Sequence, residues 1–149
     1  MANASTTGFG FRPIKKVGQT DNVGALTEYS VAASSALISH AAMVQLTADG
    51  VVLASGNTDA NNLGTLNGVF YTDADTNKPT FANFSKASNT ATDIVAFVND
   101  DPRQVYEIMS ADTAFNQNEV GGCADQVVAV GVTPLFISKS KISATTGAS

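Results

Sequence analysis

The chain has 149 residues, of which 44% are hydrophobic and only 14% are charged, and its formal net charge is −5. A chain of this length is expected to form one domain that buries roughly two thirds of the surface exposed on unfolding. The negative charge argues against a general nucleic-acid binder, which needs a cationic face, so we predict no nucleic-acid partner. So few charges on a polar surface fit a protein that commits much of its surface to neighbouring chains, and they are also found in secreted and viral β proteins in general.

Cys123 is the only cysteine, which excludes a disulfide-rich secreted scaffold. We expect this cysteine to be a small buried residue. The sequence begins without the basic start and apolar core of a signal peptide, and no run approaches about 18 apolar residues. It therefore predicts a protein that is kept soluble in a cytoplasm and does not contact a membrane.

Residues 1–24 are predicted to form an extended arm. Glycine, serine and threonine dominate its first half, Pro13 disfavours a helix, and three of the eight Lys and Arg residues fall between positions 12 and 16. One interpretation is a frayed terminus. The other, which we favour, is a segment that orders on a partner by adding extended backbone and inserting Phe9 and Phe11. The predicted contact residues of the arm are Phe9, Phe11, Arg12, Pro13, Ile14, Lys15 and Lys16.

The first predicted strand of the body covers residues 26–31. Residues 33–38 allow a helical turn because they are rich in alanine, whereas residues 43–47 have the apolar alternation of a strand. The Ala-Asp-Gly sequence at 48–50 is a hairpin signal, because glycine adopts positive φ at no steric cost, and residues 51–53 should return antiparallel.

Residues 56–64 are predicted to form a loop, and residues 66–71 the next strand, with Gly68 as a bulge or a point of close approach. Residues 80–84 are expected to pair with that strand. Towards the end of the chain, residues 126–132 and residues 135–142 supply the last two predicted strands.

The connection at residues 73–79, DADTNKP, allows two interpretations. Asp73, Asp75 and Asn77 reproduce the first three alternate oxygen ligands of a calcium loop. The pattern then fails, because lysine stands where that loop needs glycine and phenylalanine where it needs the closing glutamate. Three oxygens do not satisfy a cation that takes about six to eight. We therefore interpret the segment as a hairpin loop with turn-forming Asp and Asn, and predict no metal and no cofactor.

The centre of the domain is predicted to be an antiparallel hairpin in residues 93–110. Residues 94–99 form an apolar run that suits a strand buried on both faces, and residues 105–108 form a second strand. Between them, Pro102 fixes its own φ and disfavours helix at Asp101, which predicts a chain reversal.

Catalytic candidates are few in this sequence. His40 is the only histidine, so a Ser-His-Asp or Cys-His mechanism would have to pass through it. Neighbouring serines and Cys123 could serve as nucleophiles, but there is no G-x-S-x-G motif, and one histidine with one cysteine cannot build a usual zinc site. We interpret His40 as a structural or exposed residue and predict that the protein is not an enzyme and has no catalytic residues.

Turn signals about every 8 to 15 residues, with no long amphipathic helix, predict an all-β protein. We expect a single compact β-barrel or β-sandwich, of β-tulip or jelly-roll type, in residues 25–149, with the extended arm of residues 1–24 preceding it.

Four segments carry a resemblance to a known family: GFGFRPIKKV, QLTADGVVL, NGVFYTDADTNKPTFANF and AFVNDDPRQVYEIM. Together they resemble the small head structural proteins of tailed bacteriophages, which are described as capsid decoration or cement proteins. The most specific pieces are the arm sequence G-F-R-P-I and the pattern D-D-P-x-x-V-Y-E-I. The resemblance implies a β-rich module on the outside of an icosahedral shell, commonly oligomeric over a symmetry axis, with a terminal arm that clamps adjacent capsid subunits.

The expected function is therefore structural: a capsid decoration protein on the outer surface of the virion, assembled in the host cytoplasm. Its expected partners are the major capsid protein and other copies of itself, as a trimer in preference to a dimer. The alternative is another virion component, such as a tail- or fibre-associated β module or a host-binding head spike.

Overall fold

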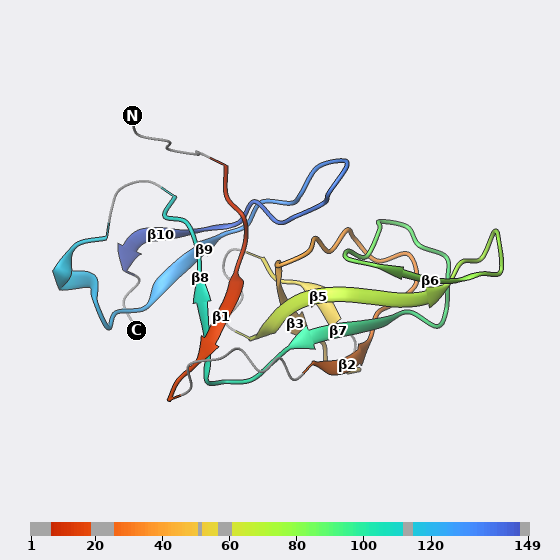
Figure 1. Ribbon diagram of the computed structural model, residues 1–149, viewed down its shortest axis with the longest axis horizontal. Helices are drawn as coiled ribbons and strands as arrows, with labels where there is room; N and C mark the ends of the chain where they lie inside the picture. Colours follow the sequence, from red (N-terminus) through yellow and green to blue (C-terminus); the bar gives the residue numbers. More distant parts are fainter. Residues whose placement is uncertain (1–6, 19–25, 51, 57–60, 112–114, 147–149) are drawn as a thin grey trace.

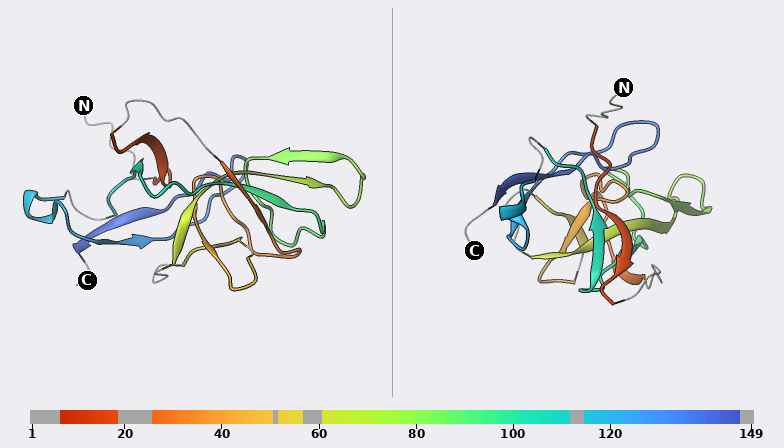
Figure 2. Two further views of the ribbon diagram at one scale, coloured as in Figure 1. Left: turned by 90° about the horizontal axis from the view of Figure 1, so that it is seen from below. Right: turned by 60° about the vertical axis from the view of Figure 1, so that its left-hand side comes forward.

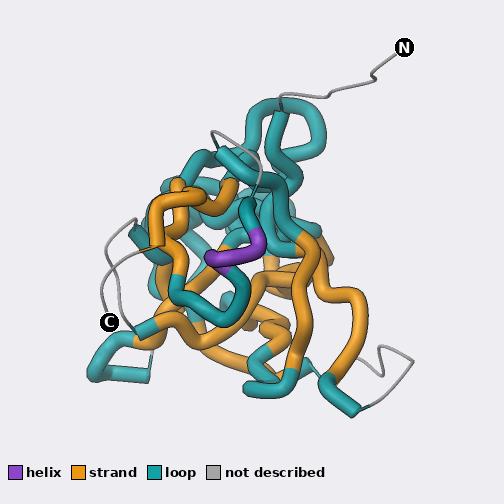
Figure 3. Tube along the Cα trace, turned by 90° about the vertical axis from the view of Figure 1, so that its left-hand side faces the viewer, coloured by secondary structure: helices purple, strands orange, loops and turns teal. Residues whose placement is uncertain are grey.

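Strands make up nearly all of the regular secondary structure in the computed structural model (Figure 1). Within the part of the chain that it describes there is no α-helix, and the only helical element is the short 3₁₀-helix η1 (Gln117–Glu119; Figure 3). The prediction of an all-β protein is therefore confirmed. The structure describes residues 7–18, 26–50, 52–56, 61–111 and 115–146.

The largest sheet has the strand order β2-β7-β5-β3-β4, and β6 pairs with the far half of β5. Every neighbouring pair is antiparallel. The sheet curls as a half-barrel rather than lying flat (Figure 2), as the right-handed twist of long strands requires. Its strands are β2 (Thr27–Ser30), β3 (Met43–Leu46), β4 (Val52–Ala54), β5 (Asn62–Thr72), β6 (Pro79–Ala82) and β7 (Val95–Asn99).

Two small antiparallel ribbons complete the architecture. One pairs β1 (Arg12–Lys16) with β8 (Gln104–Glu107), and the other pairs β9 (Ala124–Val127) with β10 (Lys141–Thr146). In Figure 1 the β9–β10 ribbon lies at the opposite end of the molecule from the β5–β6 hairpin, with β1 and β8 between them.

The core lies on the inner face of the curled sheet. Along β5, Val69 and Tyr71 are buried while Phe70 between them is exposed, as the two-residue period of a strand dictates. Ala96 and Val98 of β7 alternate in the same way with the half-buried Val95 and Phe97. One face of each strand is packed against the core, which favours the β-branched and aromatic residues found there. The core cluster comprises Val31, Ile38, Val44, Val52, Leu66, Val69, Tyr71, Ala91, Ile94, Ala96 and Val98.

The predicted central hairpin is wrong in its pairing, although both strands and the turn exist. β7 lies between β2 and β5 in the large sheet, and β8 pairs with β1 in a separate ribbon. The turn forms as the sequence predicts: Asp101 accepts hydrogen bonds from Arg103 N through its side chain and from Gln104 N through its carbonyl. The turn redirects the chain into a different sheet, because β1 supplies the partner for β8.

Two other strand pairs are confirmed. β3 and β4 form the predicted hairpin, with Gly50 at φ +75° in its turn. β6 pairs with β5 as expected, and the register of β5 shifts at Gly68, where an added Cβ would lie 3.0 Å from a ring atom of Phe81. Gly68 is thus both a bulge and a point of close approach. The predicted loop at residues 56–64 is wrong over its last residues, because β5 already begins at Asn62; residues 57–60 lie outside the described part.

The last two strands are displaced from their predicted positions. β9 ends at Val127 and β10 begins at Lys141, so residues 128–140 form a long loop instead of two strands. The loop is held by a distant segment: Gly131 N donates to Ser39 Oγ at 2.8 Å, and Ser138 N donates to the carbonyl of His40 at 2.8 Å. Because Gly131 and Ser138 bond to residues 39–40, residues 128–140 do not continue as strands.

Two local expectations also need correction. The chain makes a turn at residues 33–34 and has no helix in residues 33–38. Cys123 is exposed and not buried, because it follows the Gly121-Gly122 turn after η1 at the periphery. No helix in the described part of the chain is both long and apolar enough to span a membrane.

Candidate binding surface

The segment before β1 passes very close to the backbone of two other parts of the chain, at Ala41 and at Lys139. Phe11 N donates to the carbonyl of Ala41 at 2.9 Å. A Cβ added at Gly8 would overlap the carbonyl of Lys139, and one at Gly10, where φ is +74°, would overlap the carbonyl of Ala41. Only glycine permits such close passage of two backbones, so the G-F-G sequence has a packing reason.

Phe11 belongs to the body of the protein. Its side chain is 8% exposed, and its ring packs edge to face on Tyr106 of β8, with a centroid distance of 6.2 Å and an interplanar angle of 89°. This is a favoured aromatic geometry. Burial raises the pKa of the Tyr106 hydroxyl above its usual value, and this hydroxyl donates to the carbonyl of Asn99 at 3.1 Å.

A buried ion pair fastens the end of β1 to the turn between β7 and β8. Lys16 is 7% exposed, and its Nζ lies 2.7 Å from Asp101 Oδ2. The contact with Lys16 and the hydrogen bond from Arg103 N lower the pKa of Asp101 to about 2. The ion pair explains why a basic residue stands at this otherwise buried position.

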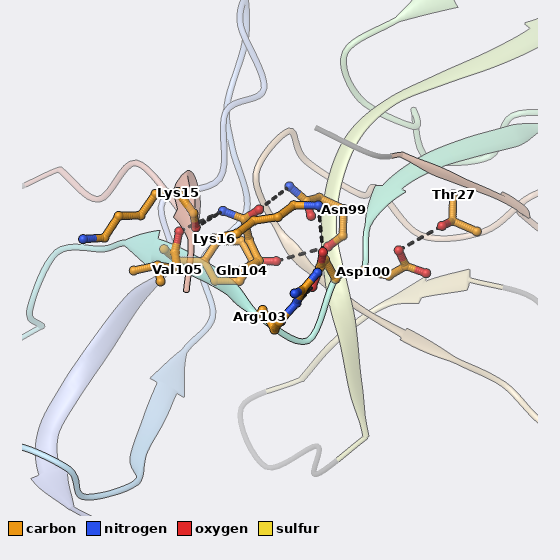
Figure 4. Close-up of polar contacts among 10 residues, drawn as sticks. Lys15, Lys16, Thr27, Asn99, Asp100, Arg103, Gln104 and Val105 are labelled. Atoms are coloured by element: carbon orange, nitrogen blue, oxygen red, sulfur yellow. Dashed lines mark hydrogen bonds and ion pairs between the residues drawn. The ribbon is translucent and has the colours of Figure 1, made fainter. Parts of the chain in front are cut away.

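The side chain of Gln104 forms a hydrogen bond with the backbone of β1 (Figure 4). Its Nε2 donates to the carbonyl of Lys15 at 2.9 Å and to that of Val105 at 3.0 Å, while its Oε1 accepts from Asn99 Nδ2 at 3.1 Å. These bonds satisfy a side chain that is only 9% exposed. β1 is therefore held by side chains as well as by its ladder with β8.

The neighbouring carboxylate, Asp100, ties the turn to the large sheet. It accepts hydrogen bonds from Thr27 Oγ1 at 2.9 Å and from the Tyr29 hydroxyl at 2.7 Å, both in β2. The bond to Asp100 raises the pKa of Tyr29 above its usual value. Two consecutive aspartates thus connect one turn to strands of two different sheets.

The predicted arm residues do not form one common surface. Phe11 and Lys16 point into the protein, Phe9 and Pro13 are half-buried, and Arg12, Ile14 and Lys15 are exposed. Arg12 pairs with Glu107 at 2.9 Å across the ribbon. Alternation along β1, broken by a register shift between Pro13 and Lys15, accounts for this division.

An exposed apolar surface lies beside the N-terminal segment, where sequence reasoning predicted strands. Val132 is 55% exposed and Leu135 62%. With Phe9 they line a groove of about 310 Å³. We call this the apolar surface; it consists of Phe9, Val132, Leu135 and Ile137.

The loop that carries the apolar surface is fixed to the body. Phe136 stacks on Phe84 with ring centroids 4.2 Å apart, and Asn83 Nδ2 donates to the carbonyl of Leu135 at 3.2 Å. The position of Pro134 between the two predicted strands was the available signal for this loop, since proline interrupts a strand ladder.

Two further candidates from the sequence have local roles. His40 is half-buried, and its Nδ1 donates to the carbonyl of Asn67 at 3.0 Å. Asp73 Oδ1 accepts from the backbone N–H groups of Thr76 and Asp75 and from the Thr76 hydroxyl, contacts that lower the pKa of Asp73. This carboxylate closes its own turn. Among the described residues, no group of three His, Cys, Asp or Glu side chains is placed to hold a metal ion.

Comparisons of the chain with protein-family models, with curated proteins and with solved structures find no match.

Proposed function

We propose that the chain is a structural virion protein, a capsid decoration protein that binds the outer surface of a bacteriophage head and stabilises the shell by bridging capsid subunits. The observation that carries the proposal is the apolar surface beside the N-terminal segment. Contiguous exposed apolar side chains on a β protein are typical of a protein–protein contact. The resemblance of the arm and of the D-D-P turn to head proteins of tailed phages supplies the partner.

The apolar surface has the features of an interface centre. Leu135 and Val132 project from a loop that is anchored by the Phe84–Phe136 stack, so little ordering of the backbone is needed on binding. Apolar anchors on a rigid support dominate interface energies, while their polar surroundings mainly exclude water. Many such contacts over a shell add up through multivalency, which is how weak individual sites can resist internal pressure.

The exposed part of β1 supplies the second part of the proposed capsid contact. Arg12 and Lys15 are exposed cations on a protein with net charge −5, and Ile14 between them is 41% exposed. Such a strip steers the protein towards an acidic partner surface. In the proposed contact Phe9, Arg12, Ile14 and Lys15 face the major capsid protein, whereas Phe11 and Lys16 hold β1 in place.

The finer architecture and assembly are part of the same proposal. The curled sheet is proposed to belong to a compact β-barrel or β-sandwich of β-tulip or jelly-roll type, with residues 1–24 as its arm. Copies are proposed to associate as trimers on the shell, because closed symmetric oligomers fit symmetry axes.

The proposal is tested by co-sedimentation of the purified protein with capsids built from the major capsid protein of the same phage genome, followed by electron cryomicroscopy. Val132→Ser together with Leu135→Ser should lower capsid occupancy, because two exposed apolar anchors are lost. The matched control is Val120→Ser, which changes a side chain that is 73% exposed in the turn after η1. Equal occupancy of both variants would refute the role of the apolar surface. Density on tails or fibres instead of heads would favour the alternative virion component.

A further inference from the structure

A second concavity lies where the β1–β8 ribbon meets the large sheet. Its volume is about 320 Å³, and its walls come from β1, from Leu26 before β2, from residues 40–41 and from β5 and the end of β7. Among the described residues, none lines both this cavity and the groove of the apolar surface. Pockets for small ligands span about 300–1,000 Å³, so this cavity fits a small molecule or a single side chain.

The charges at this cavity have one sign. Of the described residues that line it, Arg12 and His40 are titratable, and none is an aspartate or a glutamate. Arg12 is paired with Glu107, but both side chains are largely exposed, and a pair of this kind contributes little. The guanidinium also has further N–H donors besides the one that Glu107 accepts. The lining therefore favours an anionic group.

The uncharged walls define the rest of the ligand. The carbonyl of Asn67 accepts from His40 Nδ1, so Nε2 of the neutral ring is an acceptor, and His40 lines the wall without donating to an anion. Asn67 adds an exposed amide, and Pro13 and Leu26 add apolar surface, since Leu26 is 41% exposed. A ligand with one anionic end and a short apolar stem matches both parts of the cavity.

We propose that this cavity binds a carboxylate carried on a short apolar stem. Two sources share this chemistry: the side chain of a glutamate in a partner protein, and a free small aliphatic acid. Arg12 is the anion-binding group, the amide of Asn67 positions the carboxylate, and Pro13 and Leu26 contact the stem. Arg12 also belongs to the proposed capsid contact, but carboxylate binding is measured on the isolated protein, so its failure is distinguishable from a failure of capsid binding.

His40 makes the test direct. It is the only histidine of the chain, so its ring resonances in a nuclear magnetic resonance spectrum report on this cavity alone. Sodium isovalerate should shift them saturably at constant ionic strength. Isovaleramide, which has the same shape without the charge, should not. Equal shifts with both compounds, or no saturable shift with isovalerate, would overturn the proposal.

Three variants separate the site from a general charge effect. Arg12→Gln should weaken isovalerate binding at least tenfold, and Asn67→Asp should do the same by placing a carboxylate in the wall. Lys15→Gln is the matched control, because Lys15 is an exposed cation on the same strand that does not line the cavity. Unchanged thermal unfolding confirms that each variant is folded. Unchanged affinity in Arg12→Gln, or an equal loss in Lys15→Gln, refutes the site.

A peptide arm of the experiment identifies the source of the carboxylate. A blocked tripeptide with a central glutamate is compared with its glutamine counterpart and with isovalerate. Tighter binding of the glutamate peptide than of isovalerate supports the site and assigns it to a partner segment. Weaker binding supports the site and assigns it to a free acid. Equal binding of the glutamate and glutamine peptides contradicts the proposal.

Discussion

Replacing Phe11 by alanine tests whether the N-terminal segment belongs to the folded body. The side chain is only 8% exposed and packs edge to face on Tyr106. Truncating a buried phenylalanine costs about 3–5 kcal/mol, of which the aromatic pair accounts for about 0.5–1.5 kcal/mol. A domain of this size has a free energy of unfolding of about 5–15 kcal/mol, so the variant loses a large share of its stability.

The measurement is thermal unfolding followed by circular dichroism, with Val17→Ala as the control. For a chain of this length each kcal/mol lowers Tm by about 2–4 °C, so Phe11→Ala should lower it by about 6–20 °C. Val17 lies just after β1 and is 64% exposed, so its truncation should change the free energy of unfolding by under about 0.5 kcal/mol. Equal Tm values for the two variants would refute the packing of this segment on the body. If Phe11→Ala instead lowered capsid occupancy without changing Tm, Phe11 would be a partner contact, as the sequence alone suggests.

Three other outcomes are expected. Lys16→Met should destabilise the protein above about pH 4 and flatten the acid side of its stability profile. The pKa of Asp101 is depressed in the folded state, so this carboxylate stabilises the fold above its unfolded pKa and stops doing so as pH falls through about 2. Urea titrations at several pH values measure the profile, and an unchanged profile would contradict this reasoning. Gly10→Ala should cost more than Gly18→Ala. Alanine pays about 1–2 kcal/mol of strain at either position, because both have positive φ, but only at position 10 does its Cβ also clash with backbone. Equal unfolding midpoints would argue against the close backbone contact of Gly10. Cys123 should react fully with a thiol reagent in the native protein, whereas reaction only after denaturation would show that it is buried.

Local turn chemistry was readable from the sequence, because each turn depends on residues close together in the chain. The Ala-Asp-Gly turn at residues 48–50 fixes the β3–β4 hairpin, and Asp101 closes the turn after β7 with its own side chain. Asp73 is the same kind of case, since its carboxylate binds the N–H groups two and three residues on. Strand periodicity located β5 and β7 for a related reason, as burial of one face imposes alternation.

Partner choice between strands was not readable. β8 follows β7 after a short turn, yet its partner is β1, and the contacts that decide this are the Lys16–Asp101 ion pair and the packing of Phe11 on Tyr106. A basic aromatic run has the same appearance in the sequence whether its side chains meet another protein or the far end of their own chain. The expected arm therefore contained residues of both kinds.

What the sequence determined by itself is the all-β character of the protein, its turns and most of its strands, because these follow from short-range sterics and from alternating burial. Only the tertiary structure decided the pairing of β1 with β8, the anchoring of residues 128–140 on Ser39 and the resulting exposure of Val132 and Leu135. These features depend on contacts between residues far apart in the chain. Many alternative strand pairings have similar free energies, and one of them is favoured only when the whole core packs at once.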